Sequence, residues 1–183
     1  SNEGYAHAKR LVDVQSRAYR KQYGCNFITL APTNIFGPHD NYSPEHSHVI
    51  PSLIRKCDAA MRDGTDFVVW GSGKPLRQFI YSPDLARLFL WAYFNYDEAE
   101  PLILAPGPDQ EVSIATIAHH VADAFGYTKP IRFDTSYSDG QFKRTVTNAK
   151  LMSRNPSFHF TPLPEAIKAS VEWFQANRET ARL

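Results

Sequence analysis

The feature that most constrains the fold is a helical segment that runs directly into a short apolar strand. From Tyr5 to Tyr23, apolar side chains recur near helical spacing, and Gly24 follows as a stop. Residues 25–31, Cys-Asn-Phe-Ile-Thr-Leu-Ala, are typical of a buried strand that Pro32 ends. A helix leading into such a strand favours an α/β protein with a parallel sheet. Because one helix and one strand cannot build that sheet, we expect the chain to be the late part of a larger α/β unit.

The rest of the chain alternates between predicted helices and strands. A long polar loop is expected over residues 32–47, and loops of that length are often functional. A turn is expected over residues 71–75, because its glycines lack the spacing of a phosphate-binding loop. The pattern predicts a mixed α/β domain. Helices are predicted over 48–61, from Ser82 as a capping hydroxyl followed by Pro83, from Ser113 to Gly126 and over 164–177, and strands over 67–70, 77–81, 102–105 and 131–133.

Composition excludes several classes of function. The net charge of +1 argues against a nucleic-acid partner, which usually needs a basic surplus. The longest apolar stretches, such as residues 89–94, fall well short of a membrane span, and no secretory signal opens the chain. The two cysteines, Cys25 and Cys57, form no recognisable disulfide framework or metal site. We therefore expect a cytoplasmic protein without a metal, a nucleic-acid partner or a membrane partner.

A tyrosine and a lysine in the first helix are the first candidates for chemistry. Tyr5 and Lys9 are four residues apart and so lie on one helix face. A nearby ammonium stabilises a phenolate and lowers the pKa of the tyrosine, which makes it a usable general acid or base. The same spacing is common between surface neighbours with no function. The flanking sequence must therefore decide between the two interpretations.

The flanking sequence resembles the extended short-chain dehydrogenase/reductase superfamily. There, too, a Tyr-x-x-x-Lys helix precedes a parallel strand, and residues 32–38, Pro-Thr-Asn-Ile-Phe-Gly-Pro, are similar to the motif that ends this strand in members acting on nucleotide sugars. Further motifs, in the same order, resemble the GDP-L-fucose synthase family nearly end to end. They are Pro-His-Asp-Asn at 38–41, Ser-His-Val-Ile-Pro at 47–51, Val-Trp-Gly-Ser-Gly at 69–73, Arg-Gln-Phe-Ile-Tyr at 77–81 and Ser-Asp-Gly-Gln-Phe-Lys at 138–143.

The resemblance implies a domain organisation. Residues 1–36 would be the C-terminal remnant of an NADP-binding Rossmann domain, and residues 37–183 a smaller mixed α/β domain that binds a GDP-sugar. Residues from about 77 to 106 can return in part to the Rossmann domain. No Gly-x-Gly-x-x-Gly or Gly-x-x-Gly-x-x-Gly occurs in the chain, so the loop that binds the cofactor pyrophosphate is missing from it. We therefore expect the chain to bind NADP(H) poorly and to be inactive alone.

The family also implies a reaction and a homodimer. The parent enzyme would epimerise GDP-4-keto-6-deoxy-D-mannose at C3 and C5 and reduce it at C4 with NADPH, giving GDP-L-fucose. Epimerisation beside a ketone needs proton transfer at carbon and stabilisation of the keto oxygen. The resemblance assigns Tyr5, supported by Lys9, to stabilise the keto oxygen. It assigns His48 as the acid/base that transfers protons at C3 and C5, a role that an imidazole can fill because it titrates near neutrality. The expected dimer surface on the first helix includes Leu11, Val12, Arg17 and Tyr19.

The resemblance assigns the binding residues as well. A guanidinium such as that of Arg77 suits a diphosphate because its fork pairs with two oxygens, and Trp70 offers a flat apolar face, although a strand tryptophan can equally be a core residue. The implied cofactor-binding residues are Lys9, Pro32, Thr33, Asn34, Ile35 and His48, and the implied substrate-binding residues are Asn34, Lys56, Trp70, Arg77, Asp139 and Lys143.

Two alternatives stay open. Another extended nucleotide-sugar enzyme, such as a 4,6-dehydratase or a 4-epimerase, would share Tyr5 and Lys9 but would not require His48. A GDP-sugar-binding fragment without catalysis would bind GDP and show no turnover.

Overall fold

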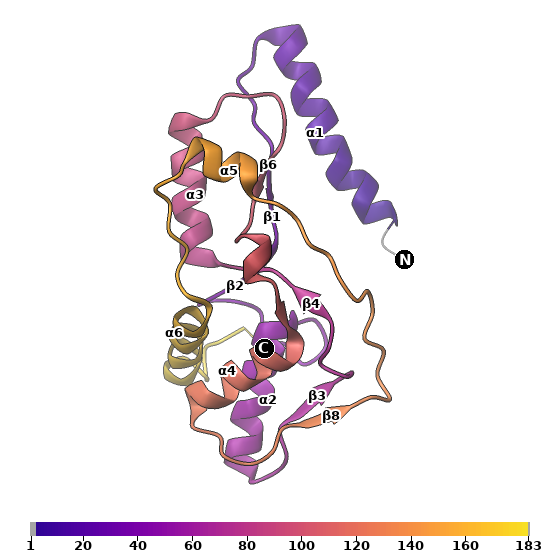
Figure 1. Ribbon diagram of the computed structural model, residues 1–183, viewed down its shortest axis with the longest axis vertical. Helices are drawn as coiled ribbons and strands as arrows, with labels where there is room; N and C mark the ends of the chain where they lie inside the picture. The colour runs from indigo at the N-terminus through magenta and orange to yellow at the C-terminus, as the bar shows by residue number, and fades with distance from the viewer. Residues whose placement is uncertain (1–2, 183) are drawn as a thin grey trace.

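Two hydrophobic clusters, arranged along the long axis of the molecule, organise the fold (Figure 1). The computed structural model describes residues 3–182. The helices are α1 (Glu3–Tyr23), α2 (Val49–Asp63), α3 (Ser82–Asn95), α4 (Ile114–Phe125), α5 (Ala149–Arg154) and α6 (Leu163–Ala176), with a 3-10 turn η1 (Pro108–Gln110). The strands are β1 (Leu30–Pro32), β2 (Asn34–Phe36), β3 (Val68–Trp70), β4 (Leu76–Arg77), β5 (Phe79–Tyr81), β6 (Leu102–Leu104), β7 (Val112–Ser113) and β8 (Arg132–Asp134).

The strands form four short pairs rather than one sheet. β1 pairs with β6, β2 with β5 and β3 with β8, all in parallel, whereas β4 and β7 are antiparallel. Every parallel pair joins segments that are distant in sequence, as parallel strands require a long connection. The predicted mixed α/β fold is confirmed for the described residues.

The larger cluster lies where α2, α4 and α6 meet. Ile117 and Val121 of α4 and Ile167, Val171 and Phe174 of α6 are fully buried there. Local signals fix the ends of α4: the Ser113 hydroxyl accepts a hydrogen bond from Thr116 N at 3.0 Å, and Gly126 ends the helix with a φ of 68°. These are the helix start and stop that the sequence predicts.

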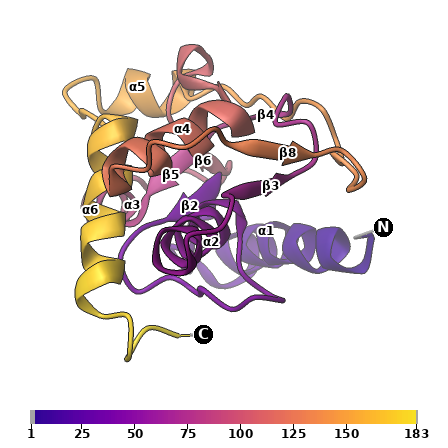
Figure 2. The same ribbon diagram turned by 90° about the horizontal axis from the view of Figure 1, so that it is seen from below.

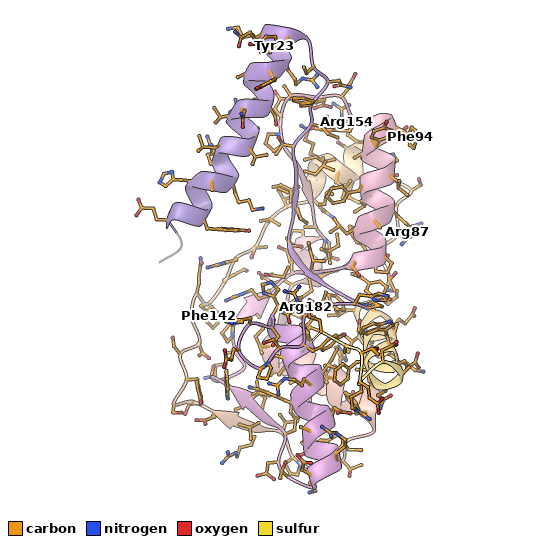
Figure 3. All side chains as sticks on the ribbon, turned by 180° about the vertical axis from the view of Figure 1, so that it is seen from behind. Tyr23, Arg87, Phe94, Phe142, Arg154 and Arg182 are labelled. Atoms are coloured by element: carbon orange, nitrogen blue, oxygen red, sulfur yellow. The ribbon has the colours of Figure 1, made fainter. Side chains whose placement is uncertain are left out.

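The smaller cluster lies under α3, against β6 and α5. Ile80 of β5, Leu88 of α3, Leu102 and Leu104 of β6, and Leu151 of α5 are its fully buried members. Successive side chains of a strand point to opposite faces, so β5 places Phe79 in the larger cluster and Ile80 in the smaller one. The outer face of α3 carries exposed apolar side chains, of which Phe94 is labelled in Figure 3.

In Figure 1 the helix α1 lies toward the end of the long axis opposite to α2, α4 and α6, and in Figure 2, seen from below, it lies partly behind α2. Asp13 is its one buried residue among those described, and Leu11, Val12 and Tyr19 are exposed. Arg17, also expected at a dimer surface, is exposed and pairs with Asp13 within the helix at 2.9 Å. No helix in the described range 3–182 is long and apolar enough to cross a membrane.

The strand predicted over residues 25–31 is wrong in its bounds. Only residues 30–32 are in register with β6. The Thr29 carbonyl still accepts a hydrogen bond from Leu102 N of β6 at 2.9 Å, but the Phe27 carbonyl accepts one from the Arg20 side chain at 3.2 Å. Pro32 therefore lies within the strand rather than after it. The loop predicted from residue 32 is interrupted as well, since Asn34–Phe36 forms β2 against β5.

Two further predictions of local structure are wrong, and one helix was not foreseen. The strand over 77–81 is split at Gln78 because β4 pairs with β7 while β5 pairs with β2. Tyr81, not Ser82, is the N-cap of α3 and makes no side-chain capping bond. The Ser82 hydroxyl lies against Gly37 instead, only 2.1 Å from where a Cβ at Gly37 would stand. The short helix α5 had no predicted counterpart.

Candidate functional site

A cavity of about 270 Å³ lies between α2, the end of β3 and the loop that follows β8. Four of the residues expected to hold the GDP part of a substrate line it: Lys56, Trp70, Arg77 and Asp139. They come from α2, β3, β4 and the loop after β8, so only the tertiary structure brings them together. Ser47 and Val49, which flank His48 in sequence, also line this cavity.

Trp70 and Lys56 form one wall of the cavity. The Trp70 side chain is 51% exposed, so the alternative of a core tryptophan is wrong. The Lys56 ammonium nitrogen lies 3.5 Å from the centroid of a Trp70 ring, a cation–π contact. Burial, and next the charge of Arg55, lower the pKa of Lys56 to about 8. A lysine with such a pKa gains or loses its proton near neutrality and responds to an arriving anion.

Arg77 holds the loop over residues 141–142 as well as lining the cavity. Its guanidinium donates hydrogen bonds to the carbonyl oxygens of Gln141 at 2.6 Å and Phe142 at 3.3 Å, and to its own neighbour Leu76 at 2.7 Å. Burial, and next the charge of Arg144, lower its pKa. Some of the Arg77 N–H groups that a diphosphate could accept from are thus already bonded to backbone carbonyls. The sequence did not indicate these bonds.

Asp139 fastens the same loop to the turn after β3. Its two carboxylate oxygens accept hydrogen bonds from the backbone N–H and the hydroxyl of Ser72, both at 2.7 Å, and these bonds lower the pKa of Asp139. Gly71 has a φ of 86°, and a Cβ there would stand 2.5 Å from an Asp139 oxygen. The turn therefore requires glycine at this position.

The other two predicted substrate residues lie outside this cavity. The Lys143 ammonium pairs with the Glu111 carboxylate at 3.3 Å. The Asn34 amide donates to the Gln78 carbonyl at 2.8 Å, joining β2 to the start of β5. Neither residue lines the cavity.

Tyr5 and Lys9 lie together on α1, apart from the cavity. The Lys9 ammonium is 5.5 Å from the centroid of the Tyr5 ring, so the predicted shared helix face is confirmed. Tyr5 is 67% exposed. All three views show the N-terminal end of α1 on the side of the molecule along which the loop with Phe142 runs (Figures 1, 2 and 3).

His48 is the N-cap residue of α2 and is exposed. Asp40, in the preceding loop, lies near enough for the charge of His48 to affect the pKa of its carboxyl. Burial raises the pKa of the Asp40 carboxyl, and this is opposed by a hydrogen bond from Asn41 N and by the charges of His48 and Arg182. The structure thus places a half-buried carboxyl near His48, a neighbour that sequence reasoning missed.

Residues 32–35 lie at the end of β1 and in β2. Thr33 N donates to the Leu104 carbonyl at 3.2 Å, while the Thr33 hydroxyl is buried and has no hydrogen-bond partner among the described residues. Pro32, Asn34 and Ile35 are exposed. A buried hydroxyl beside exposed backbone and apolar surface fits one edge of a planar cofactor ring.

A second cavity, of about 400 Å³, was not foreseen. It lies between the start of α6, the start of α3 and the turn η1, and it shares no lining residue with the first. Its walls include the aromatic rings of Phe36, Phe79, Tyr81 and Phe160. Asp84 at its edge is already satisfied, since it accepts from Thr161 N at 2.7 Å and pairs with Arg87 at 2.6 Å.

Comparison with known proteins supplies the family. Residues 1–105 match the profile of the NAD dependent epimerase/dehydratase family. The chain is similar over its whole length to a GDP-L-fucose synthase of Dictyostelium discoideum (53% identical, 57% of that protein covered) and to a probable GDP-L-fucose synthase of Drosophila melanogaster (50% identical, 59% covered).

A solved structure agrees with these relatives. A GDP-L-fucose synthetase from Naegleria fowleri, bound to NADP, superposes on the whole chain with a TM-score of 0.97 and 49% identity, and the chain covers 59% of it. The chain thus spans less than two thirds of the length of the relatives it matches. It belongs to the NAD dependent epimerase/dehydratase family, as a partial-length homologue of the GDP-L-fucose synthases.

Proposed function

We propose that this chain supplies the GDP-sugar site and part of the proton-transfer machinery of an enzyme that converts GDP-4-keto-6-deoxy-D-mannose to GDP-L-fucose. The observation that carries the proposal is the convergence of Lys56, Trp70, Arg77 and Asp139 on one cavity. A nucleoside diphosphate calls for a flat apolar wall, cations for its phosphates and an acceptor for its hydroxyls, and this cavity has all three. The names of the relatives support the same ligand.

In this proposal each cavity residue contacts a different part of the ligand. Trp70 faces the base, and Lys56 and Arg77 face the diphosphate. Lys56 has a pKa of about 8, so an arriving diphosphate favours its charged form and strengthens the contact. Asp139 and Ser72, joined by hydrogen bonds, form the rim toward the ribose.

Tyr5, Lys9 and His48 are assigned the proton transfers. The Tyr5 hydroxyl faces the 4-keto oxygen, donates a hydrogen bond to it as negative charge develops, and gives it a proton on reduction. The Lys9 ammonium beside the Tyr5 ring favours the phenolate that this leaves. His48 exchanges a proton with the sugar carbons in the epimerisations.

NADPH, when bound, supplies the hydride for the reduction at C4. Of the chain's own residues, Lys9, Thr33 and His48 would hold its nicotinamide end, together with the backbone of Pro32, Asn34 and Ile35. The unpartnered, buried Thr33 hydroxyl fits a polar edge of that ring. The chain has no glycine-rich turn for the pyrophosphate, so we expect weak binding of the whole cofactor.

The domain boundary at residues 36–37 is part of the proposal. The parallel pair β1–β6, with α3 beside it, would belong to the Rossmann domain, which includes part of residues 77–106. The larger cluster around α2, α4 and α6 would be the substrate domain. The intact enzyme would be a homodimer that uses the exposed face of α1 around Leu11, Val12 and Tyr19.

Calorimetric titration of the 183-residue chain with GDP, and separately with NADPH, tests the proposal. GDP is expected to bind and NADPH to bind weakly or not at all, because the cavity residues are present and the glycine-rich turn is not. Binding of NADPH without binding of GDP would contradict the proposal.

A second candidate function is binding of the GDP-sugar without catalysis by this chain. The observation in its favour is that neither Tyr5 nor Lys9, both on α1, lines the cavity. A turnover assay with GDP-4-keto-6-deoxy-D-mannose and NADPH distinguishes the two, because a binding fragment holds the substrate without forming GDP-L-fucose.

A further inference from the structure

An aromatic side chain with no assigned role lies on Trp70. The rings of Tyr137 and Trp70 are stacked, with centroids 4.5 Å apart and an interplanar angle of 11°. Tyr137 comes from the loop after β8, in the segment Thr135-Ser-Tyr-Ser138. Its ring remains 46% exposed, so packing in the core does not explain its position.

The backbone on both sides of Tyr137 is held in place. The pairing of β3 with β8 sets Trp70 opposite Asp134, and the Asp134 carbonyl accepts from Gly71 N at 2.8 Å and from Tyr137 N at 3.4 Å. On the other side, Asp139 holds Ser72 through two hydrogen bonds. Because the loop is fastened before and after it, the Tyr137 ring is held over the indole.

Lys56 and Tyr137 occupy different faces of Trp70. A nearly parallel ring at this distance covers the face on which it stacks and leaves no room there for an ammonium group. The Lys56 ammonium, 3.5 Å from a Trp70 ring centroid, therefore lies on the other face. Lys56 lines the cavity and Tyr137 does not, so the face under Lys56 is the one that a ligand reaches.

We propose that Tyr137 is a positioning residue for the nucleobase: it supports the outer face of Trp70, so that the indole stays a flat cavity wall on which a purine stacks in place of the Lys56 ammonium. The inference rests on the proposed function, which supplies the nucleoside diphosphate as ligand. The displaced ammonium then lies free to meet the diphosphate of the same ligand. Base stacking on an aromatic face is a substantial part of nucleotide affinity, so a fixed indole matters to binding.

The test is calorimetric titration of the 183-residue chain, as wild type, Y137A and Y137F, with GDP and with inorganic pyrophosphate. The Y137A variant is expected to bind GDP with a Kd raised roughly two- to tenfold, the usual worth of an aromatic pair. The Y137F variant keeps the ring and should match wild type, because the Tyr137 hydroxyl has no hydrogen bond to any described residue. Pyrophosphate has no base, so its Kd should be the same in all three proteins.

A second measurement does not depend on the ligand. Acrylamide quenching of tryptophan fluorescence should increase in Y137A and not in Y137F, because the loss of the ring uncovers Trp70. The increase should vanish when W70F is added to both, which assigns it to Trp70 rather than to Trp91 or Trp173.

The outcomes separate the two proposals. A wild-type chain that fails to bind GDP rejects the proposed GDP site, while the quenching result still decides whether Tyr137 covers Trp70. If wild type binds GDP and Y137A binds it equally well or more tightly, the proposed function stands and the role of Tyr137 is overturned. Equal weakening of GDP and pyrophosphate binding would also overturn it, because the effect would then not concern the base.

Discussion

Single side chains that line the cavity also hold the loops around it together. Arg77 lines the cavity and donates to the carbonyl oxygens of Gln141 and Phe142. Asp139 lines it and accepts from Ser72. Each charge is therefore held in a fixed position before a ligand arrives, which lowers the entropy cost of binding. The predicted binding role of either residue and its observed structural role are compatible.

Lys56 should make GDP binding depend on pH. Its ammonium is expected to contact the diphosphate, and its pKa in the free protein is about 8, so the Kd should rise about tenfold as the pH is raised through that value. Calorimetric titrations at a series of pH values on both sides of the Lys56 pKa measure this. K56R is the control, because a guanidinium stays charged and its Kd should be nearly flat. The same pH dependence in K56R would mean that another group titrates.

The same pKa fixes the sign of a stability effect. Folding lowers the pKa of Lys56 from 10.5 to about 8, so between these values the unfolded chain holds more protons than the folded one. The contribution of Lys56 to the free energy of unfolding therefore rises with pH across that window. Well below the lower value, both states are protonated and the full cost of burying the charge is present.

At the scale of elements, the cavity depends on one turn and one loop that hold each other. The turn after β3 contains Gly71 in a left-handed conformation, directly against Asp139 of the loop after β8. Neither segment is regular secondary structure. The hydrogen bonds between Asp139 and Ser72 therefore position Trp70, Tyr137 and the rim together.

Gly71→Ala is expected to destabilise the protein more than a positive φ alone explains. An alanine at Gly71 adds a clash with the Asp139 carboxylate, whereas Gly140, with a φ of 65°, has nothing within 4 Å of an added Cβ. Gly140→Ala should cost about 1 kcal/mol of unfolding free energy, and Gly71→Ala at least about 1 kcal/mol more. Denaturant unfolding of both variants measures the difference. Equal losses of unfolding free energy in the two variants would show that the turn accommodates the added methyl group without further cost.

At the scale of the whole molecule, the C-terminal segment ties distant parts together. Arg178, beyond α6, and Arg62 of α2 each donate to the Asp58 carboxylate at 3.0 Å, and Asp58 is almost completely buried. The Arg182 carbonyl accepts from Tyr42 N at 2.8 Å. The last described residues thus fasten α6 to α2 and to the loop that leads to His48.

Arg178→Met should lower the free energy of unfolding by about 1–3 kcal/mol, because it removes two charge-assisted hydrogen bonds from a buried carboxylate. Lys168→Met is the matched control: the Lys168–Glu172 pair is 3.9 Å apart and exposed, so its loss should be close to neutral. Thermal or denaturant unfolding of the two variants gives the comparison. A neutral Arg178→Met would mean that Arg62 alone satisfies Asp58.

The sequence by itself determined the positions of the longer helices, the two ends of α4 and four of the side chains that line the cavity. Helix signals are local: α4 begins at Ser113 and ends at Gly126, as predicted, because its hydrogen bonds join residues four apart. The family motifs named Lys56, Trp70, Arg77 and Asp139 before any geometry was known.

The tertiary structure decided the strands and the arrangement of the site. β1 comprises only Leu30–Pro32 because its register with β6 spans just these three residues, and no local pattern carries that information. Three contacts join segments far apart in sequence: the stack of Tyr137 on Trp70, the hydrogen bond from Arg77 to the Gln141 carbonyl, and the hydrogen bond from Ser72 N to Asp139. Such contacts form only once packing has brought distant segments together, so residue types and spacings alone could not predict them.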